Sequence, residues 1–283
     1  MGIRTTKMEA GLENTIIKYL VEKLDYEYVE PAEMKVVFNK RHAIDEVRVL
    51  RFIESTQPEA YENHRLATEN GKRDFINQLS RNIAKNGIAK VLRDGVRMYP
   101  SGVILFYHDI NEKRPSSIEE FNQNIFSVTN QLTYSETNSG LELDLCLFIN
   151  GLPVFTSELK SRASSTGWTY LDAEEQYKND RDPKDTLFSF KRCIAHFAVD
   201  ENNISFTTKL EGQSTRFMPF NKGDGKSGAG NPLGDGIQTD YLWKVFFEKK
   251  EMARLISDFC YVVGGKKNEK EVMIFPRYHQ WRV

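Results

Sequence analysis

The sequence predicts an α/β or α+β fold in which a central sheet is flanked by helices. The main observation is the order of the expected elements: helices begin the chain, a run of strands with one helix fills its middle, and a helix follows. Composition is the second observation, since 40% hydrophobic and 28% charged residues are typical of a globular chain with a sizeable core. The length of 283 residues fits one large domain or two small ones.

The first part of the chain is expected to be helical. Residues 8–24 carry apolar side chains at helical spacing. Residues 70–93 do the same, with Gly87 expected to interrupt the run. Residues 95–108 then change to the apolar composition of a strand.

The middle of the chain is expected to supply the sheet. A helix over residues 116–126 should begin with a capping box, because Ser117 precedes Glu120 by three positions. A further helix begins within 171–180, and the strands are expected over 130–136, 141–150, 152–161 and, as a pair, within 187–210. Residues 221–237 are dense in glycine, which predicts a long loop, and helical spacing returns over 239–260.

Charge and cysteine usage argue against several classes of protein. The net charge of -1 gives no overall basic field of the kind that indicates a nucleic-acid partner, although a basic cleft is compatible with a balanced total. Cys146, Cys193 and Cys260 are widely spaced, which argues against zinc and against a disulfide framework and indicates a reducing cytoplasm. We expect neither a secretory signal nor a membrane span, because no apolar run is long enough.

The stretch "LELDLCLFINGLPVFTSELK", residues 141–160, predicts a hairpin that carries three charges in apolar surroundings. Side chains alternate along a strand, so Glu158 and Lys160 share a face, and a turn at 149–153 lets Asp144 approach Glu158 across the pair. Two adjacent carboxylates repel unless a cation neutralises them, and such a pair suits Mg²⁺. A metal there would activate water against a phosphate, with Lys160 positioning that water. The alternative, a solvated weak ion pair, fits the apolar flanks less well.

The same hairpin resembles the nuclease signature of the restriction (R, HsdR-type) subunit of type I restriction-modification enzymes. That family carries a PD-(D/E)xK core written D-x-x-x-F-x-N-G-x-P-x-x-x-x-E-x-K, and Leu143 stands where the family usually has proline. The resemblance covers roughly residues 9–283, and the matching positions are Asp144, Asn150, Gly151, Pro153, Glu158 and Lys160. It implies a mixed α/β, restriction-endonuclease-like fold with Asp144, Glu158 and Lys160 as catalytic residues and the two carboxylates as metal ligands.

Further residues follow from the resemblance. The family carries a Q-x-x-x-Y motif on the next helix, where Gln176 matches and would support the site or contact DNA. Asp180 stands at the tyrosine position, and Tyr177 follows the glutamine directly. Glu13, on the first helix, is either an additional ligand or a solvated helix residue. Basic residues near the site would contact phosphates or be solvated, and they lie at 160–162, 178–182 and 191–192.

The resemblance implies a Mg²⁺-dependent endonuclease domain of a type I site-specific deoxyribonuclease that cuts double-stranded DNA in the cytoplasm, away from membranes. Modification and specificity subunits would be its partners. Residues 1–260 would form the nuclease domain and 261–283 a linker to a helicase-like motor, so we expect an N-terminal fragment. ATP would bind that motor only: Gly225-Lys226-Ser227 looks like the end of a Walker A, but Phe220 replaces its first glycine. The alternatives are a stand-alone repair or junction nuclease and a catalytically degenerate docking module.

Overall fold

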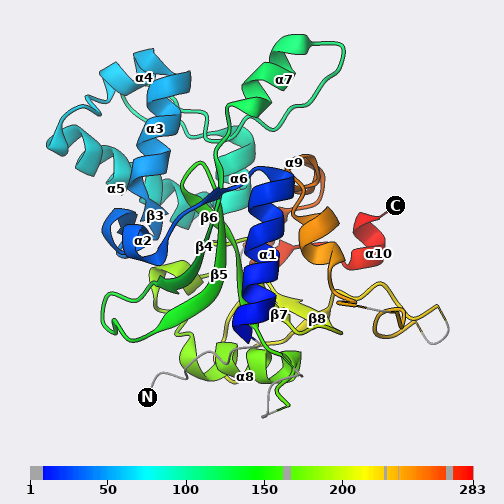
Figure 1. Cartoon of the computed structure of the whole chain (residues 1–283). Coiled ribbons are helices and arrows are strands. Elements are labelled where there is room, and N and C mark those ends of the chain that lie inside the picture. Colours follow the sequence, from blue (N-terminus) through cyan, green and yellow to red (C-terminus); the bar gives the residue numbers. More distant parts are fainter. Residues whose placement is uncertain (1–8, 162–166, 226–227, 235, 266–269, 283) are drawn as a thin grey trace.

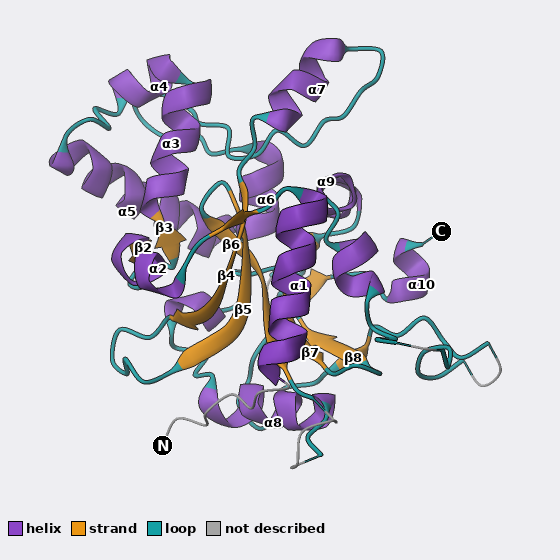
Figure 2. Cartoon of the chain, viewed as in Figure 1, coloured by secondary structure: helices purple, strands orange, loops and turns teal. Residues whose placement is uncertain are grey.

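The computed structural model describes residues 9–161, 167–225, 228–234, 236–265 and 270–282. A seven-stranded mixed sheet forms the centre of the described chain, in the order β1-β4-β5-β6-β7-β8-β9. Helices surround this sheet (Figure 2). The predicted mixed α/β fold with a central sheet flanked by helices is therefore confirmed, and it agrees with the restriction-endonuclease-like arrangement that the resemblance implies.

The strands of the central sheet are β1 (Glu27–Tyr28), β4 (Phe126–Thr133), β5 (Glu142–Ile149), β6 (Leu152–Leu159), β7 (Ala195–Val199), β8 (Ile204–Thr207) and β9 (Met218–Pro219). Strands β4, β5 and β6 pair antiparallel, whereas β6 and β7 run parallel. Parallel neighbours need a crossover connection, and α8 (Tyr170–Asp180) lies within it. Two smaller pairs consist of β2 (Phe38–Asn39) with β3 (Ile44–Asp45) and β10 (Tyr261–Val263) with β11 (Val272–Ile274).

The other helices are α1 (Glu9–Leu24), α2 (Pro31–Val37), α3 (Glu46–Thr56), α4 (Pro58–Asn63), α5 (Glu69–Asn86), α6 (Ile88–Asp94), α7 (Pro115–Asn122), α9 (Lys249–Asp258) and α10 (Tyr278–Trp281). Short helical turns lie at Thr186–Phe188 and Leu242–Phe246. Figure 1 shows α1 running alongside the sheet and α8 crossing its lower end in that view. Within the described part of the chain, every helix is too short or too polar to cross a membrane.

Several predictions of secondary structure are confirmed, and two are wrong. Helix α1 and the α5–α6 pair lie where expected, and Gly87, at φ +83°, separates the pair. The strand predicted over 95–108 is absent, because this partly buried segment makes only the single bridge between Val96 and Val103. The side of β4 that faces away from β5 is taken by β1, so the segment finds no ladder partner there.

The capping box predicted for the helix at 116–126 is also wrong. Pro115 occupies the first turn, where its fixed φ is favourable, and α7 therefore starts earlier than expected. Ser117 lies inside the helix, where its hydroxyl can donate to the carbonyl oxygen of Arg114, at 2.8 Å, or of Asn111, at 3.1 Å. The residue before the helix, Arg114, makes no side-chain cap.

Two hydrophobic clusters cover the two faces of the sheet. The larger contains Leu12, Ile16 and Leu20 of α1, which contacts β4 and β6. The smaller contains Tyr177 of α8 and Met34 of α2. All eight residues of β6 are buried, which confirms the prediction of a strand covered on both faces. A charge at the end of β6 is consequently costly unless it has a partner.

The chain after α9 returns to the larger cluster. Phe275 and Trp281 are both buried there. Their rings lie 4.7 Å from Phe206 and 5.0 Å from Phe246, respectively. The predicted division of the chain at residue 260 stays a prediction. The described residues of 221–237 form neither helix nor strand, and Lys226 and Ser227 lie outside the described residues.

Candidate active site

The turn between β5 and β6 fixes the geometry of the hairpin. Asn150 and Gly151 both have positive φ, 48° and 77°, as favoured tight hairpin turns require. The Asn150 side chain accepts the N–H of Ile125 at 2.6 Å and donates to the carbonyl oxygen of Leu105 at 2.9 Å. A Cβ on Gly151 would lie 2.4 Å from the carbonyl oxygen of Asp45, so only glycine fits without a shift. The register of the two strands is thereby set.

Asp144 lies where the two strands stop pairing. The β5–β6 ladder ends at the pair Leu145–Ser157, one residue before Asp144 and Glu158. Beyond that point, Oδ2 of Asp144 accepts the backbone N–H of Leu159 at 2.8 Å. The side chain of β5 is thus tied to β6 directly beside Glu158, which confirms the predicted approach of Asp144 across the pair.

Glu158 is fully buried, and its two oxygens have different surroundings. Oε1 accepts the Nε–H of Arg181 at 2.6 Å, whereas Oε2 has no hydrogen-bond partner. Burial raises the pKa of Glu158 to about 8, and the negative charge of Asp144 adds to this, although Arg181 and Lys160 act in the opposite direction. Negative charge at Glu158 is therefore costly, and one oxygen of its side chain is buried without a hydrogen-bond partner.

Arg181, the residue after α8, is a member of the site that sequence reasoning missed. Besides Glu158, its guanidinium donates to the Tyr134 hydroxyl at 3.1 Å and to the Glu142 carbonyl oxygen at 2.8 Å. Burial alone would lower the pKa of Arg181, but the contact with Glu158 raises it above the ordinary value. The buried glutamate was the available signal, because such a group calls for a cation.

The expectation that the basic residues near the site contact phosphates or are solvated is wrong for three of them. Arg181 is 3% exposed, Lys191 7% and Arg192 3%. Lys191 pairs with Glu271, and Arg192 donates to a backbone oxygen. Within residues 160–162, position 162 lies outside the described residues.

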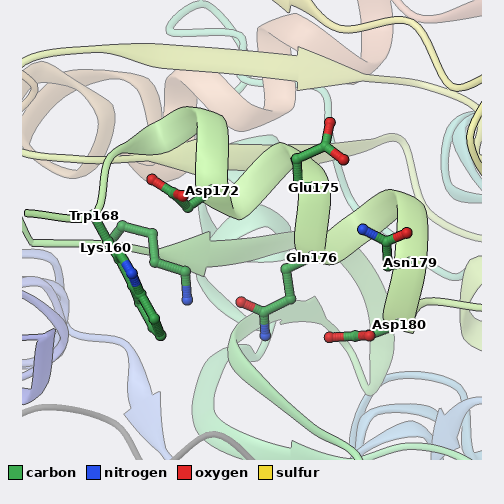
Figure 3. A pocket seen from close by; sticks show the side chains of 7 residues that line it. All are labelled: Lys160, Trp168, Asp172, Glu175, Gln176, Asn179 and Asp180. Carbon is green, nitrogen blue, oxygen red and sulfur yellow. The ribbon is translucent and has the colours of Figure 1, made fainter. Parts of the chain in front are cut away.

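Lys160 and Gln176 line one cavity of about 250 Å³. Figure 3 shows both side chains reaching into the same space, with the Trp168 ring alongside the lysine. The ammonium nitrogen of Lys160 lies 5.3 Å from that ring's centre, and Lys160 is only 5% exposed. Oε1 of Gln176 is buried without a hydrogen-bond partner. The remaining lining residues are Asp172, Glu175, Asn179 and Asp180.

Tyr177 lies away from this cavity. Its side chain is fully buried, and its hydroxyl is 2.8 Å from that of Thr156. The Thr156 hydroxyl is in turn 2.7 Å from Nδ1 of His196. This buried chain of polar groups supports β6 from the α8 side, two residues before Glu158. Asp180, which occupies the tyrosine position of the motif, lines the cavity.

Glu13 of α1 is bound to β4. Its carboxylate accepts the side-chain N–H groups of Asn130 at 2.6 Å and Gln131 at 2.8 Å. Gln131, at φ +46°, interrupts the β4–β5 pairing at the position that faces Asp144. Glu13 is 5% exposed, so the interpretation as a solvated helix residue is wrong. Its role as an additional ligand stays a prediction.

The residues fit a hard cation that needs few protein ligands. In the described ranges, no group of three or more His, Cys, Asp or Glu side chains has the arrangement of a metal site. Mg²⁺ is commonly held by one or two carboxylates and several waters. Asp144 and Glu158, whose Oε2 has no hydrogen-bond partner, supply such a pair. The donor set therefore suits Mg²⁺ better than metals that require imidazole or thiolate.

A known protein family matches the part of the chain that contains this site. A family model described as the type I restriction enzyme R protein N terminus matches residues 6–215 of the 283-residue chain. The matched range includes the hairpin, α8 and Arg181. A search of curated proteins gave no match.

Proposed function

The chain belongs to the family of type I restriction enzyme R protein N termini, and we propose that it is the Mg²⁺-dependent endonuclease domain of such a subunit, hydrolysing phosphodiester bonds of double-stranded DNA. The observation that carries this proposal is the meeting of Asp144, Glu158 and Lys160 at the end of the β5–β6 ladder, with Oε2 of Glu158 buried and unpaired. Buried polar atoms nearly always have a partner. A buried oxygen without a partner therefore supports a site that a ligand completes.

Each residue has a role that its surroundings allow. Asp144 and Glu158 would hold Mg²⁺, which when bound polarises a phosphate and lowers the pKa of a coordinated water. Lys160 can only donate hydrogen bonds, so it would orient the attacking water through a lone pair and offset negative charge on the phosphate. Gln176, with its unpaired oxygen beside the same cavity, would accept a hydrogen bond from that water or from DNA.

Family membership implies a complex with other type I subunits and DNA. Within that complex, a specificity subunit would choose the sequence and a modification subunit would methylate it. A helicase-like motor of the full-length subunit would use ATP. The cytoplasm would be the place of action, where Cys146, Cys193 and Cys260 stay reduced.

Metal binding tests the site assignment. Calorimetric titration with Mn²⁺ should give at least a tenfold weaker Kd, about 1.4 kcal/mol, for Asp144→Ala than for the wild type. Glu175→Ala is the matched control, because this exposed carboxylate lines the same cavity away from the hairpin and pairs with Lys178. Equal Mn²⁺ affinity of the wild type and Asp144→Ala would contradict the assignment.

DNA cleavage tests the role of Lys160. In a type I complex assembled with ATP, Lys160→Ala should abolish plasmid cleavage while leaving ATP-driven translocation intact, because the motor lies elsewhere. Retained cleavage by this variant would refute the proposed role.

One observation favours a different function, a catalytically inactive docking module. Arg181 already provides Glu158 with a counter-ion, so the carboxylate has a structural partner without any metal. If the chain is a docking module, the wild type should not bind Mn²⁺, and substitution of Asp144 should not change DNA cleavage by the complex. Metal binding that depends on Asp144 would exclude it.

A further inference from the structure

The contact between Arg181 and Glu158 is one-sided. A guanidinium commonly pairs with a carboxylate through two parallel bonds. Here only Nε donates, and it reaches only Oε1, at 2.6 Å. The second oxygen is left buried without a partner. The arginine thus binds one half of the carboxylate and leaves the other half for something else.

The remaining donors of Arg181 are bound by other elements. Nη1 donates to Tyr134, which follows β4, and Nη2 donates to the carbonyl oxygen of Glu142 at the start of β5. Tyr134 is itself held, since its hydroxyl donates to the Asp180 carbonyl oxygen at 3.2 Å. Its ring meets that of Phe188 edge-on, with the ring centres 4.7 Å apart. The guanidinium is therefore anchored in three directions and is not a side chain that swings freely.

The position of this cation suits the charge of the site. Two carboxylates, Asp144 and Glu158, lie next to each other at the end of a buried strand. An unpaired buried charge is costly, and a guanidinium stays charged under all ordinary conditions. The Arg181 guanidinium therefore offsets part of the cost of negative charge at Glu158, and it leaves the second oxygen of that side chain without a partner.

We propose that Arg181 is a positioning residue for Glu158, holding Oε1 so that Oε2 is presented to a divalent metal ion. The proposal rests on the function proposed above, because it requires a metal at Asp144 and Glu158. It differs from an arginine that competes with the metal, since a competitor would have to leave the carboxylate and break its contacts with Tyr134 and Glu142 as well.

Metal affinity without DNA separates these possibilities. We would titrate the 283-residue chain with Mn²⁺ by calorimetry, using the wild type, Arg181→Met and Arg181→Lys. Arg192→Met is the matched control: Arg192 is also 3% exposed, but its bond goes to the Ala43 carbonyl oxygen and it does not contact Glu158. Thermal melting and circular dichroism would establish that each variant is folded.

The expected result is a loss of affinity confined to position 181. Arg181→Met should weaken Mn²⁺ binding about tenfold or more, equivalent to ~1.4 kcal/mol. Arg181→Lys should also bind Mn²⁺ at least threefold more weakly than the wild type, but more tightly than Arg181→Met. Lysine keeps the positive charge but lacks the planar group that donates several hydrogen bonds in fixed directions. Arg192→Met should lower the melting temperature yet bind Mn²⁺ within twofold of the wild type.

Three results would overturn the inference. If Arg181→Met binds Mn²⁺ like the wild type, Arg181 serves the fold only. If it binds more tightly, Arg181 competes with the metal. If Arg181→Met does not fold, Arg181→Lys decides, and an affinity within twofold of the wild type would count against positioning. Absence of Mn²⁺ binding by the wild type is a separate result, because it removes the proposed function and this inference together.

Discussion

His196 offers a quantitative test of the layer that supports the site. It is fully buried on β7, directly beside Thr156 of β6, with Nδ1 2.7 Å from the threonine hydroxyl. Burial lowers the pKa of His196 from the usual 6.5 to about 3. Substitution His196→Gln removes the titrating ring and keeps a side chain that can bond to Thr156.

The sign and size follow from proton linkage. Because the folded pKa is lowered, the unfolded chain takes up the proton first as the pH falls, so the stability that neutral His196 contributes is present above pH 6.5 and is lost toward pH 3. At pH 5 the loss relative to pH 8 is about 2 kcal/mol. Glu158 acts oppositely: its pKa is raised to about 8, so its contribution is present below its unfolded pKa and is lost as the pH rises through 8.

The assay must therefore compare variants at each pH. Urea unfolding of the wild type and His196→Gln at pH 8, 6 and 5 gives the difference in unfolding free energy, from which the Glu158 contribution cancels. The wild type's advantage should shrink by about 2 kcal/mol between pH 8 and pH 5. His279→Gln, at an exposed position, is the control. A difference that does not change with pH would refute the reasoning.

Two further predictions concern the turn and the C-terminal segment. Gly151→Ala should lower the free energy of unfolding by more than the roughly 1–3 kcal/mol that an unfavourable backbone conformation costs. The reason is that the new Cβ would also lie 2.4 Å from a backbone oxygen of β3. Gly212→Ala, at φ +58° in open space, measures the backbone cost alone, and equal losses of melting temperature would disprove the steric argument. A chain truncated after Val263 should lose cooperative thermal unfolding, since removing Phe275 and Trp281 costs about 3–5 kcal/mol each. A melt as sharp as that of the full chain would show that this segment is dispensable.

The hairpin was predictable because its determinants are local. Alternation placed Glu158 and Lys160 on one face, and Gly151 and Pro153 indicated the turn. These features need no knowledge of the rest of the fold, and the structure shows the strands at β5 and β6 as expected. Gln176 was predicted in another way, from the resemblance to the Q-x-x-x-Y motif of the family.

Arg181 was not predictable in this way. It lies in a charged run, 178–182, where the local pattern indicates a solvated surface. Only the packing of α8 against β6 brings its guanidinium to Glu158. The segment 95–108 shows the converse error, because most of its apolar residues are buried, yet a strand exists only where a neighbour offers a ladder. Helices α2 to α4 were also not predicted, and α2 and α4 are short, with seven and six residues.

The proposed site has a consequence for how the chain folds. Asp144, Glu158, Lys160 and Arg181 all come from the continuous segment 144–181. The loops that close when they meet are short, so the entropy lost on closure is small. Other contacts join segments that are far apart in the sequence: the Tyr26 hydroxyl donates to the Phe247 carbonyl oxygen across 221 residues. Contacts of low sequence separation form fast, so we expect the geometry of the site to arise early, as one supersecondary unit, before the distant parts of the chain close around it.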